Sequence, residues 1–252
     1  MNTVLPVILI LLSAIILFPG YCRSCAARLF QANPVRKILE SVRSEESFLP
    51  LSEIDPLFIR LLISAEDLRF YEHHGYDLTA IFRAIRHDLN NLTNRSEWVG
   101  ASTITQQLSR NLYLNHDRTF IRKLKEFFLT LMIERELTKD EILELYCNIL
   151  YFGLGIYGIR NGSLRLIGKL PQSLTMNECL TILSVIPGPN VANPLKRDDP
   201  DQIRRFCMWR ETKIGALLYN GTITEKEAES LRAEGWPLPE EETQTPEDPF
   251  AE

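Results

Sequence analysis

Residues 65–77 of the chain read AEDLRFYEHHGYD, a stretch in which two adjacent carboxylates, Glu66 and Asp67, follow an apolar run. A His-His-Gly comes a few positions later. Side chains of these types suit a metal site, a general acid or base, or the solvated end of a helix. The remaining sequence has to distinguish these three interpretations.

The metal interpretation has little support in the sequence. His73 and His74 are adjacent and would point apart on any regular element, and only His87 and His116 remain in the chain. Neither H-E-x-x-H nor a comparable ligand spacing occurs. We therefore expect no metal ion held by histidines.

The acid/base interpretation fits better. Glu66 ends an apolar segment, where partial burial and the neighbouring charge of Asp67 would both suit a carboxylate that exchanges protons near neutral pH. The alternative that stays open is that both carboxylates are surface charges at a helix end.

The composition is that of a globular protein of one moderate-sized domain with short extensions. The chain has 252 residues, of which 45% are hydrophobic and 24% charged. Its formal net charge of -5 argues against a large nucleic-acid interface. Residues 237–252 carry part of this acidity and are expected to form a disordered tail. The five cysteines predict no disulfide scaffold, and we interpret Cys22-x-x-Cys25 as coincidence rather than as a redox or zinc motif.

The N-terminus predicts a membrane anchor. No charged side chain precedes Arg23, and residues 4–18 are continuously apolar, which suits a single helix across a bilayer. We assign residues 1–22 to this transmembrane anchor and residues 23–50 to a juxtamembrane linker. A cleaved signal peptide is the alternative, but its usual basic start is missing.

Helix signals dominate residues 51–236, the expected folded domain. Thr-x-x-Glu capping boxes open three apolar periodic segments, at Thr138/Glu141, Thr175/Glu178 and Thr224/Glu227. Further helices are expected over residues 55–65, 78–90, 102–111, 120–137 and 201–219, and loops over 151–158 and 187–194. No run of alternating strands occurs, so the sequence predicts a mainly α fold.

One glycine pattern resembles a cofactor motif. GLGIYG, residues 153–158, matches the G-x-G-x-x-G dinucleotide fingerprint, which works only between a strand and a helix. Here it follows the capped helix that begins near Thr138. We therefore expect a tight turn rather than a dinucleotide site.

The segment GASTITQQLSRN, residues 100–111, suits a sugar-phosphate ligand. If a helix begins at Ser102, one of its faces is polar throughout: Thr103, Gln106, Gln107 and Arg110. The opposite face is apolar and faces the core: Ile104, Leu108 and Leu112. Hydroxyl, amide and guanidinium groups bind sugar hydroxyls and phosphates well, and an ordinary solvated face is the alternative.

The next helix begins with cations in an unfavourable place. Arg122, Lys123 and Lys125 lie in its first turns, where each opposes the helix dipole by roughly 0.3–1 kcal/mol. In the Arg122/Glu126 pair the basic residue is also on the N-terminal side, and an ion pair in this order stabilises a helix less than the reverse order. A basic helix start makes sense if an anion binds there, and an ordinary salt-bridged surface is the alternative.

Together these segments resemble the peptidoglycan glycosyltransferase family, which comprises the glycan-polymerising domain of bifunctional penicillin-binding proteins and the monofunctional biosynthetic transglycosylases. EDLRFYEHHGYD (66–77) is similar to the family's E-D-x-x-F-x-x-H-x-G-x-D, and GASTITQQ (100–107) to its G-x-S-T-I-T-Q-Q. RKLKE (122–126) is similar to R-K-x-x-E, and KDEILELYCN (139–148) to K-x-x-I-L-E-x-Y-x-N. The remaining residues leave no room for a transpeptidase domain, so the resemblance implies the monofunctional type.

The resemblance implies a lysozyme-like glycosyltransferase domain with a smaller membrane-facing lobe. The implied substrate is lipid II, whose 4-hydroxyl attacks the growing glycan strand with inversion, forms a β-1,4 linkage and releases undecaprenyl pyrophosphate. No cofactor is required by this chemistry, although some family members use Mg²⁺ or Mn²⁺ at the pyrophosphate. The implied partners are lipid II, the nascent glycan strand, cytoplasmic membrane lipid and other cell-wall synthesis proteins, with no nucleic acid.

The resemblance also assigns roles to individual residues. Glu66 matches the general base, and Glu126 matches the second catalytic carboxylate, on the donor side. Positions near the donor's pyrophosphate and sugars are Thr103, Gln107, Arg110, Arg122 and Lys123. Motif residues that shape the substrate cleft are Asp67, Phe70 and His73.

The chain departs from the family pattern in two places. Arg110 stands where the family has Lys, which keeps the charge but changes its geometry. RNGSLRLIGK, residues 160–169, replaces the family's E-x-A-A and Y-F-G-K segment. This second departure leaves the proposed catalytic residues intact and puts the packing beside them in question.

The charges after the apolar N-terminus conflict with the implied location. Basic residues follow this segment and none precedes it: Arg23, Arg28, Arg36 and Lys37. The positive-inside rule by itself would therefore place the domain in the cytoplasm. Because lipid II is polymerised outside the membrane, we nevertheless expect a single-pass protein of the bacterial cytoplasmic (inner) membrane with its catalytic domain outside.

Two other functions remain open from the sequence. A lytic transglycosylase or lysozyme-like enzyme shares the fold and one key glutamate, but it cleaves neutral glycosidic bonds and has no pyrophosphate for Arg122 and Lys123 to hold. A catalytically silent cell-wall scaffold would tolerate the altered residues 160–169, but it would have no need for both Glu66 and Glu126.

Overall fold

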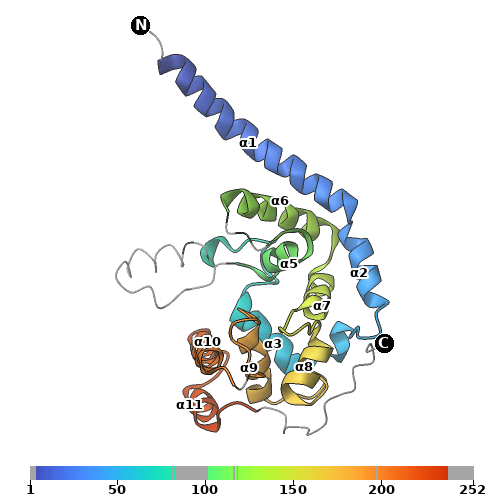
Figure 1. Cartoon of the computed structure of the whole chain (residues 1–252), viewed down its shortest axis with the longest axis vertical. Helices are drawn as coiled ribbons and strands as arrows, with labels where there is room; N and C mark the ends of the chain where they lie inside the picture. The colour runs from blue at the N-terminus through green and yellow to red at the C-terminus, as the bar shows by residue number, and fades with distance from the viewer. Residues whose placement is uncertain are drawn as a thin grey trace. The chain divides into compact units, whose positions relative to one another are not determined.

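The structure is a computed structural model that describes residues 4–237 except 81, 83–101, 116, 118 and 197, with side chains from residue 18 onward. In this part of the chain every regular element is a helix, and the one strand-like feature is a bridge between Tyr151 and Tyr157. The predicted mainly α fold is therefore confirmed (Figure 1). The expected helix over residues 78–90 lies outside the described residues beyond its first turn, and the expected tail lies outside them beyond Pro237.

The chain forms two compact units, one of Met1–Glu46 and Glu66–Tyr146 and one of Ser47–Ala65 and Cys147–Glu252. The helices of the first unit are α1 (Val4–Ala32), α2 (Val35–Arg43), α5 (Ile104–Tyr113), α6 (Phe120–Glu136) and most of α7 (Lys139–Ile149). Those of the second are η1 (Leu51–Glu53), α3 (Pro56–Glu66, apart from its last residue), α8 (Ile159–Ile167), α9 (Met176–Val185), α10 (Pro200–Tyr219) and α11 (Glu225–Glu234).

In the first unit, helix α6 packs against both α1 and α5. The buried side chains of α1 recur every four residues, at Cys22, Ala26 and Phe30, and so form one stripe along the helix. Phe18 also stacks on Phe120, at a ring-centroid distance of 6.4 Å. The helix that carries Arg122, Lys123 and Glu126 therefore has an apolar support along its length.

Much of the segment predicted as a linker, residues 23–50, is helical. Helix α1 continues to Ala32, and α2 buries three apolar side chains, Val35, Leu39 and Val42. These residues find apolar partners within the first unit, which no local sequence signal indicates. Among the helices of the described residues, none is long and apolar enough to cross a membrane.

All three predicted capping boxes form. At the starts of α9 and α11, Thr175 and Thr224 accept the N3 backbone N–H, and the N3 glutamate accepts the cap residue's own N–H. Before α7, Thr138 and Glu141 make the same reciprocal pair, at 2.9 and 3.2 Å. These bonds satisfy amide groups that have no partner inside the helix, which is why the starts of these helices could be predicted.

Helix α8 was not predicted, because two glycines obscure its pattern. It begins after Gly158, whose φ is 79°, and it contains Gly162. A Cβ at Gly162 would lie 2.4 Å from a ring atom of Phe152. Close packing against that ring therefore outweighs the low helix propensity of glycine.

The two predicted loops, residues 151–158 and 187–194, lie against each other in the second unit. Gly153 has a φ of 83°, and a Cβ there would lie 2.3 Å from the carbonyl oxygen of Pro189. The Asn193 amide Nδ2 donates a hydrogen bond of 2.8 Å to the carbonyl of Phe152. GLGIYG thus forms a tight turn after a helix, as expected, and brings its backbone next to another loop.

Candidate active site

Glu66 is the last residue of α3, and side chains from α5 and α7 hold its carboxylate. Gln107 Nε2 donates to Glu66 Oε2 at 3.0 Å, and the Tyr146 hydroxyl donates to Gln107 Oε1 at 2.9 Å. Glu66 and Gln107 are partly exposed, whereas Tyr146 is fully buried. The carboxylate is therefore both accessible to solvent and fixed in orientation, which is what a general base requires.

Asp67 has different hydrogen-bond partners and connects its loop to α5. Its buried carboxylate accepts the backbone N–H of Ile104 at 3.0 Å and the Nε2–H of His73 at 2.8 Å. His73 Nδ1 accepts the backbone N–H of Gly75 at 3.1 Å, so the imidazole proton resides on Nε2. The two adjacent carboxylates of the motif thus have different surroundings, one accessible and one structural.

Phe70 and Asp77 of this loop are also buried and held by contacts. Phe70 is fully buried, and the Lys139 ammonium lies 4.5 Å from the centre of its ring. Asp77 accepts hydrogen bonds from the Arg69 guanidinium and, at 2.6 Å, from the Thr79 hydroxyl. The Arg69 bonds hold the pKa of the Asp77 carboxyl well below its usual range. No role for Asp77 was predicted from the sequence. The one signal that could have indicated a role is the place of Asp77 at the end of the family motif.

Thr103 and Gln106 do not lie on an exposed polar face of α5. The helix begins at Ile104 rather than at Ser102, so Thr103 is its N-cap and forms a capping box with Gln106. Both side chains are buried, and the Thr103 hydroxyl donates to the carbonyl of Gly75 at 2.7 Å. The predicted four-residue polar face is therefore wrong in this respect, because local capping uses two of its members. Thr103 supports the loop that contains Gly75 in this structure, while Gln107 and Arg110 are partly exposed.

Glu126 lies in α6 with 1% of its surface exposed and pairs with both cations of its motif. Its Oε2 accepts from Arg122 Nη1, and its Oε1 accepts from Lys123 Nζ. A buried carboxylate needs such partners, because an unpaired charge in the interior is strongly destabilising. The Lys123 side chain is nevertheless 47% exposed. The cluster of Arg122, Lys123 and Glu126 therefore presents positive charge near the first turns of α6.

Two arginines of the first unit carry a buried nitrogen without a hydrogen bond. Within the described residues, neither Arg110 Nε nor Arg122 Nε has an acceptor. Buried polar groups in folded proteins almost always have a partner, so an unsatisfied guanidinium nitrogen calls for an explanation. An anionic ligand that accepts from these arginines would provide one.

All of the predicted site residues belong to the first unit. The hydrogen bonds place eight of them in a Glu66/Gln107 group, an Asp67/His73/Thr103 loop support and the Arg122/Lys123/Glu126 cluster. Phe70 and Arg110 belong to none of these three groups. Tyr146 joins the first group and was missed by the sequence analysis, although it is the tyrosine of the KDEILELYCN motif. Among the described residues, no group of three or more His, Cys, Asp or Glu side chains is arranged to hold a metal ion.

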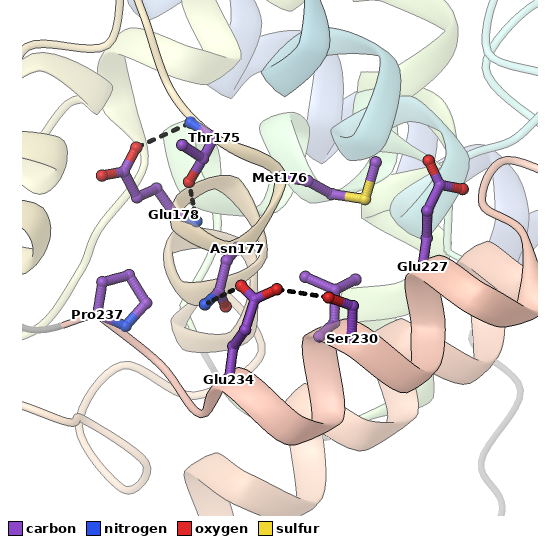
Figure 2. A pocket seen from close by; sticks show the side chains of 9 residues that line it. Thr175, Met176, Asn177, Glu178, Glu227, Ser230, Glu234 and Pro237 are labelled. Atoms are coloured by element: carbon purple, nitrogen blue, oxygen red, sulfur yellow. Dashed lines mark hydrogen bonds between the residues drawn. The ribbon is translucent and has the colours of Figure 1, made fainter.

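A pocket of about 360 Å³ in the second unit contains none of these residues (Figure 2). Helices α9 and α11 line it, and its carboxylates already have partners. Glu178 caps α9 through Thr175, and Glu234 accepts from the Ser230 hydroxyl at 2.6 Å. These acidic groups are therefore engaged in contacts within the second unit, and the pocket is not the candidate active site.

Comparisons with known proteins agree with these motifs. The family model described as Transglycosylase matches residues 31–212. Penicillin-binding protein 1A of Escherichia coli is 42% identical over 184 residues, which are 73% of this chain and 21% of that protein. Penicillin-binding protein 1F of Bacillus subtilis is 38% identical over 178 residues, 71% of this chain and 24% of that protein. The chain thus spans less than a quarter of the length of these two relatives.

A third relative is similar over most of its own length. It is a protein of Cupriavidus necator whose name describes it as a transglycosylase, and it is 35% identical over 196 residues, 76% of this chain and 83% of that protein. The family model and this relative together cover the Glu66 loop, the Arg122/Lys123/Glu126 cluster and the helices that hold them. The chain belongs to the transglycosylase family, the peptidoglycan glycosyltransferases.

Proposed function

We propose that this protein polymerises lipid II into β-1,4-linked glycan strands and releases undecaprenyl pyrophosphate. The observation that carries the proposal is the Arg122/Lys123/Glu126 cluster in the same unit as an accessible, oriented Glu66. A glutamate alone would serve glycan cleavage equally well. A pair of cations supported by a buried carboxylate suits a donor that carries a pyrophosphate.

In the proposed reaction, Glu66 acts on the acceptor. The 4-hydroxyl oxygen of an incoming lipid II attacks the anomeric carbon of the growing strand, and its proton passes to the Glu66 carboxylate. The bond between the anomeric carbon and the pyrophosphate oxygen breaks, and its electron pair leaves with the pyrophosphate. Attack from the face opposite the leaving group inverts the anomeric configuration, so an α-linked donor gives a β-linked product.

Arg122, Lys123 and Arg110 act on the donor in this proposal. Negative charge develops on the pyrophosphate as its bond to the sugar breaks, and positioned cations stabilise that charge. Glu126 keeps Arg122 and Lys123 in place, since its two oxygens each accept from one of them. A divalent ion, where one takes part, would be held chiefly by the pyrophosphate oxygens, because both Glu126 oxygens are already engaged.

Incubation of the detergent-solubilised protein with labelled lipid II tests this proposal. We expect polymeric glycan that lysozyme digests, together with undecaprenyl pyrophosphate. The same preparation should not cleave finished peptidoglycan. Cleavage of glycan without polymer would indicate a lytic enzyme, and neither product from a folded preparation would indicate a scaffold.

We further propose that the protein is attached to the cytoplasmic membrane with its catalytic domain outside. The uncharged N-terminal segment and the location of lipid II polymerisation support this orientation, and the basic residues after the segment oppose it. A reporter enzyme that is active only outside the cytoplasm, fused after Pro237, should therefore be active. Activity of a cytoplasm-specific reporter at the same junction would contradict the orientation.

A further inference from the structure

A chain of two hydrogen bonds connects Tyr146 to Glu66, the proposed base, through one intervening side chain, that of Gln107. The Tyr146 hydroxyl donates to Gln107 Oε1 at 2.9 Å, and Gln107 Nε2 donates to Glu66 Oε2 at 3.0 Å. The three side chains come from α7, α5 and the end of α3. Tyr146 has no exposed surface, so it does not contact a substrate from solvent.

The geometry fixes the orientation of the Gln107 amide. An ionised carboxylate can only accept hydrogen bonds, so the amide must turn its NH₂ group toward Glu66. Its carbonyl oxygen then faces Tyr146 and requires a donor there, which the phenol hydroxyl supplies. A phenylalanine at this position would leave the Gln107 carbonyl oxygen without this donor, and nothing on the α7 side would then hold the amide in one orientation.

We propose that Tyr146 is a positioning residue for the general base and acts through Gln107. With the amide held in this orientation, its N–H donates to Glu66 Oε2 and holds the carboxylate in one position. The carboxylate is therefore in place to accept the acceptor's proton before lipid II arrives. If the amide turned over, its carbonyl oxygen would face the carboxylate and this hydrogen bond would be lost. This inference rests on the proposed function.

The substitution Tyr146→Phe tests the proposal, because it removes one hydroxyl and keeps the ring. We expect kcat for lipid II polymerisation to fall about tenfold, the size of one buried hydrogen bond. KM for lipid II should change little, because Tyr146 has no exposed surface and does not contact the substrate. The affinity for a moenomycin-type phosphoglycolipid, which mimics the donor, should not change. An unchanged kcat would overturn the proposal.

A double-mutant cycle separates this role from simple packing. If Tyr146 acts through Gln107, Tyr146→Phe should have little further effect on kcat in a Gln107→Ala background. Equal losses in both backgrounds would show that Tyr146 acts by packing, and the proposal would fail. Tyr113→Phe is the matched control, since its hydroxyl donates to the backbone carbonyl of Asn33 at 2.8 Å instead. That control should leave kcat unchanged.

A second variant covers the case in which Tyr146→Phe does not fold. Incorporation of 3-fluorotyrosine at position 146 keeps the ring and the hydroxyl and makes the hydroxyl a stronger donor. We then expect kcat at or above the wild-type value, because the donor to Gln107 Oε1 is kept, and a tenfold loss of kcat would overturn the proposal. If the wild-type protein does not polymerise lipid II, the proposed function itself fails. The wild-type activity is therefore measured before any variant is compared.

Discussion

Replacing Glu66 with glutamine is expected to lower kcat for lipid II polymerisation by roughly 10²- to 10⁴-fold, the usual contribution of a general base. Glutamine keeps the shape of the side chain and can still bond to Gln107, but it cannot accept the proton of the acceptor hydroxyl. The affinity for the donor mimic should change little, because the Arg122/Lys123/Glu126 cluster does not involve Glu66. Steady-state polymerisation and phosphoglycolipid binding measure the two effects separately.

The control for this variant is Glu72→Gln. Glu72 lies in the same loop, is exposed and undergoes the same chemical change, so kcat should stay near the wild-type value. Normal polymerisation by Glu66→Gln would mean that Glu66 is not the base. The Glu66 carboxylate would then be a surface charge at the end of a helix, which is the alternative interpretation of the motif.

The second large effect is expected from Lys123→Ala. A hydrogen bond between charged groups contributes about 1.5–3 kcal/mol, so loss of the Lys123 contact with the pyrophosphate should weaken binding of the donor mimic about 10- to 150-fold. Turnover should fall as well, because in the proposed reaction the same cation stabilises the leaving pyrophosphate. Lys123 is half exposed, and Arg122 still pairs with the buried Glu126 in the variant, so the protein should remain folded.

Lys125→Ala provides the matched comparison for this experiment. It removes the same charge from the same helix, but Lys125 makes neither of the Glu126 hydrogen bonds described above. We expect a much smaller loss of affinity from this change, and one that disappears at high salt, because a distant charge acts through a screened field. Equal losses for Lys123→Ala and Lys125→Ala would show that α6 attracts the donor by general charge and that Lys123 has no specific contact.

The sequence by itself determined the helical class, the starts of several helices and the family. Capping boxes connect residues three positions apart, as Thr175 and Glu178 do, so the information that decides them lies within one turn. The family motifs are equally local. Glu66, Arg122, Lys123 and Glu126 could therefore be named as candidates from short patterns of residue types.

Where local signals were ambiguous, tertiary packing decided the outcome. Helix α8 forms despite Gly162 because that glycine allows close contact with Phe152. Residues 23–50, expected as a linker, contain helical turns whose apolar side chains are buried in the first unit. The sequence contains the apolar residues in both cases, but burial depends on which surfaces meet once the chain has folded.

Only the tertiary structure decided which polar groups pair at the candidate site. Gln107 meets Glu66 from 41 positions away, and Tyr146 meets Gln107 from 39. Asp67 and Glu66 are neighbours in sequence, yet one is buried against the start of α5 and the other is accessible. A hydrogen bond of this kind stabilises the structure more when water is excluded around it. Water is excluded only when segments that are distant in sequence pack together. The sequence could name Glu66 as the candidate base, but the residues that orient its carboxylate became visible only in the folded chain.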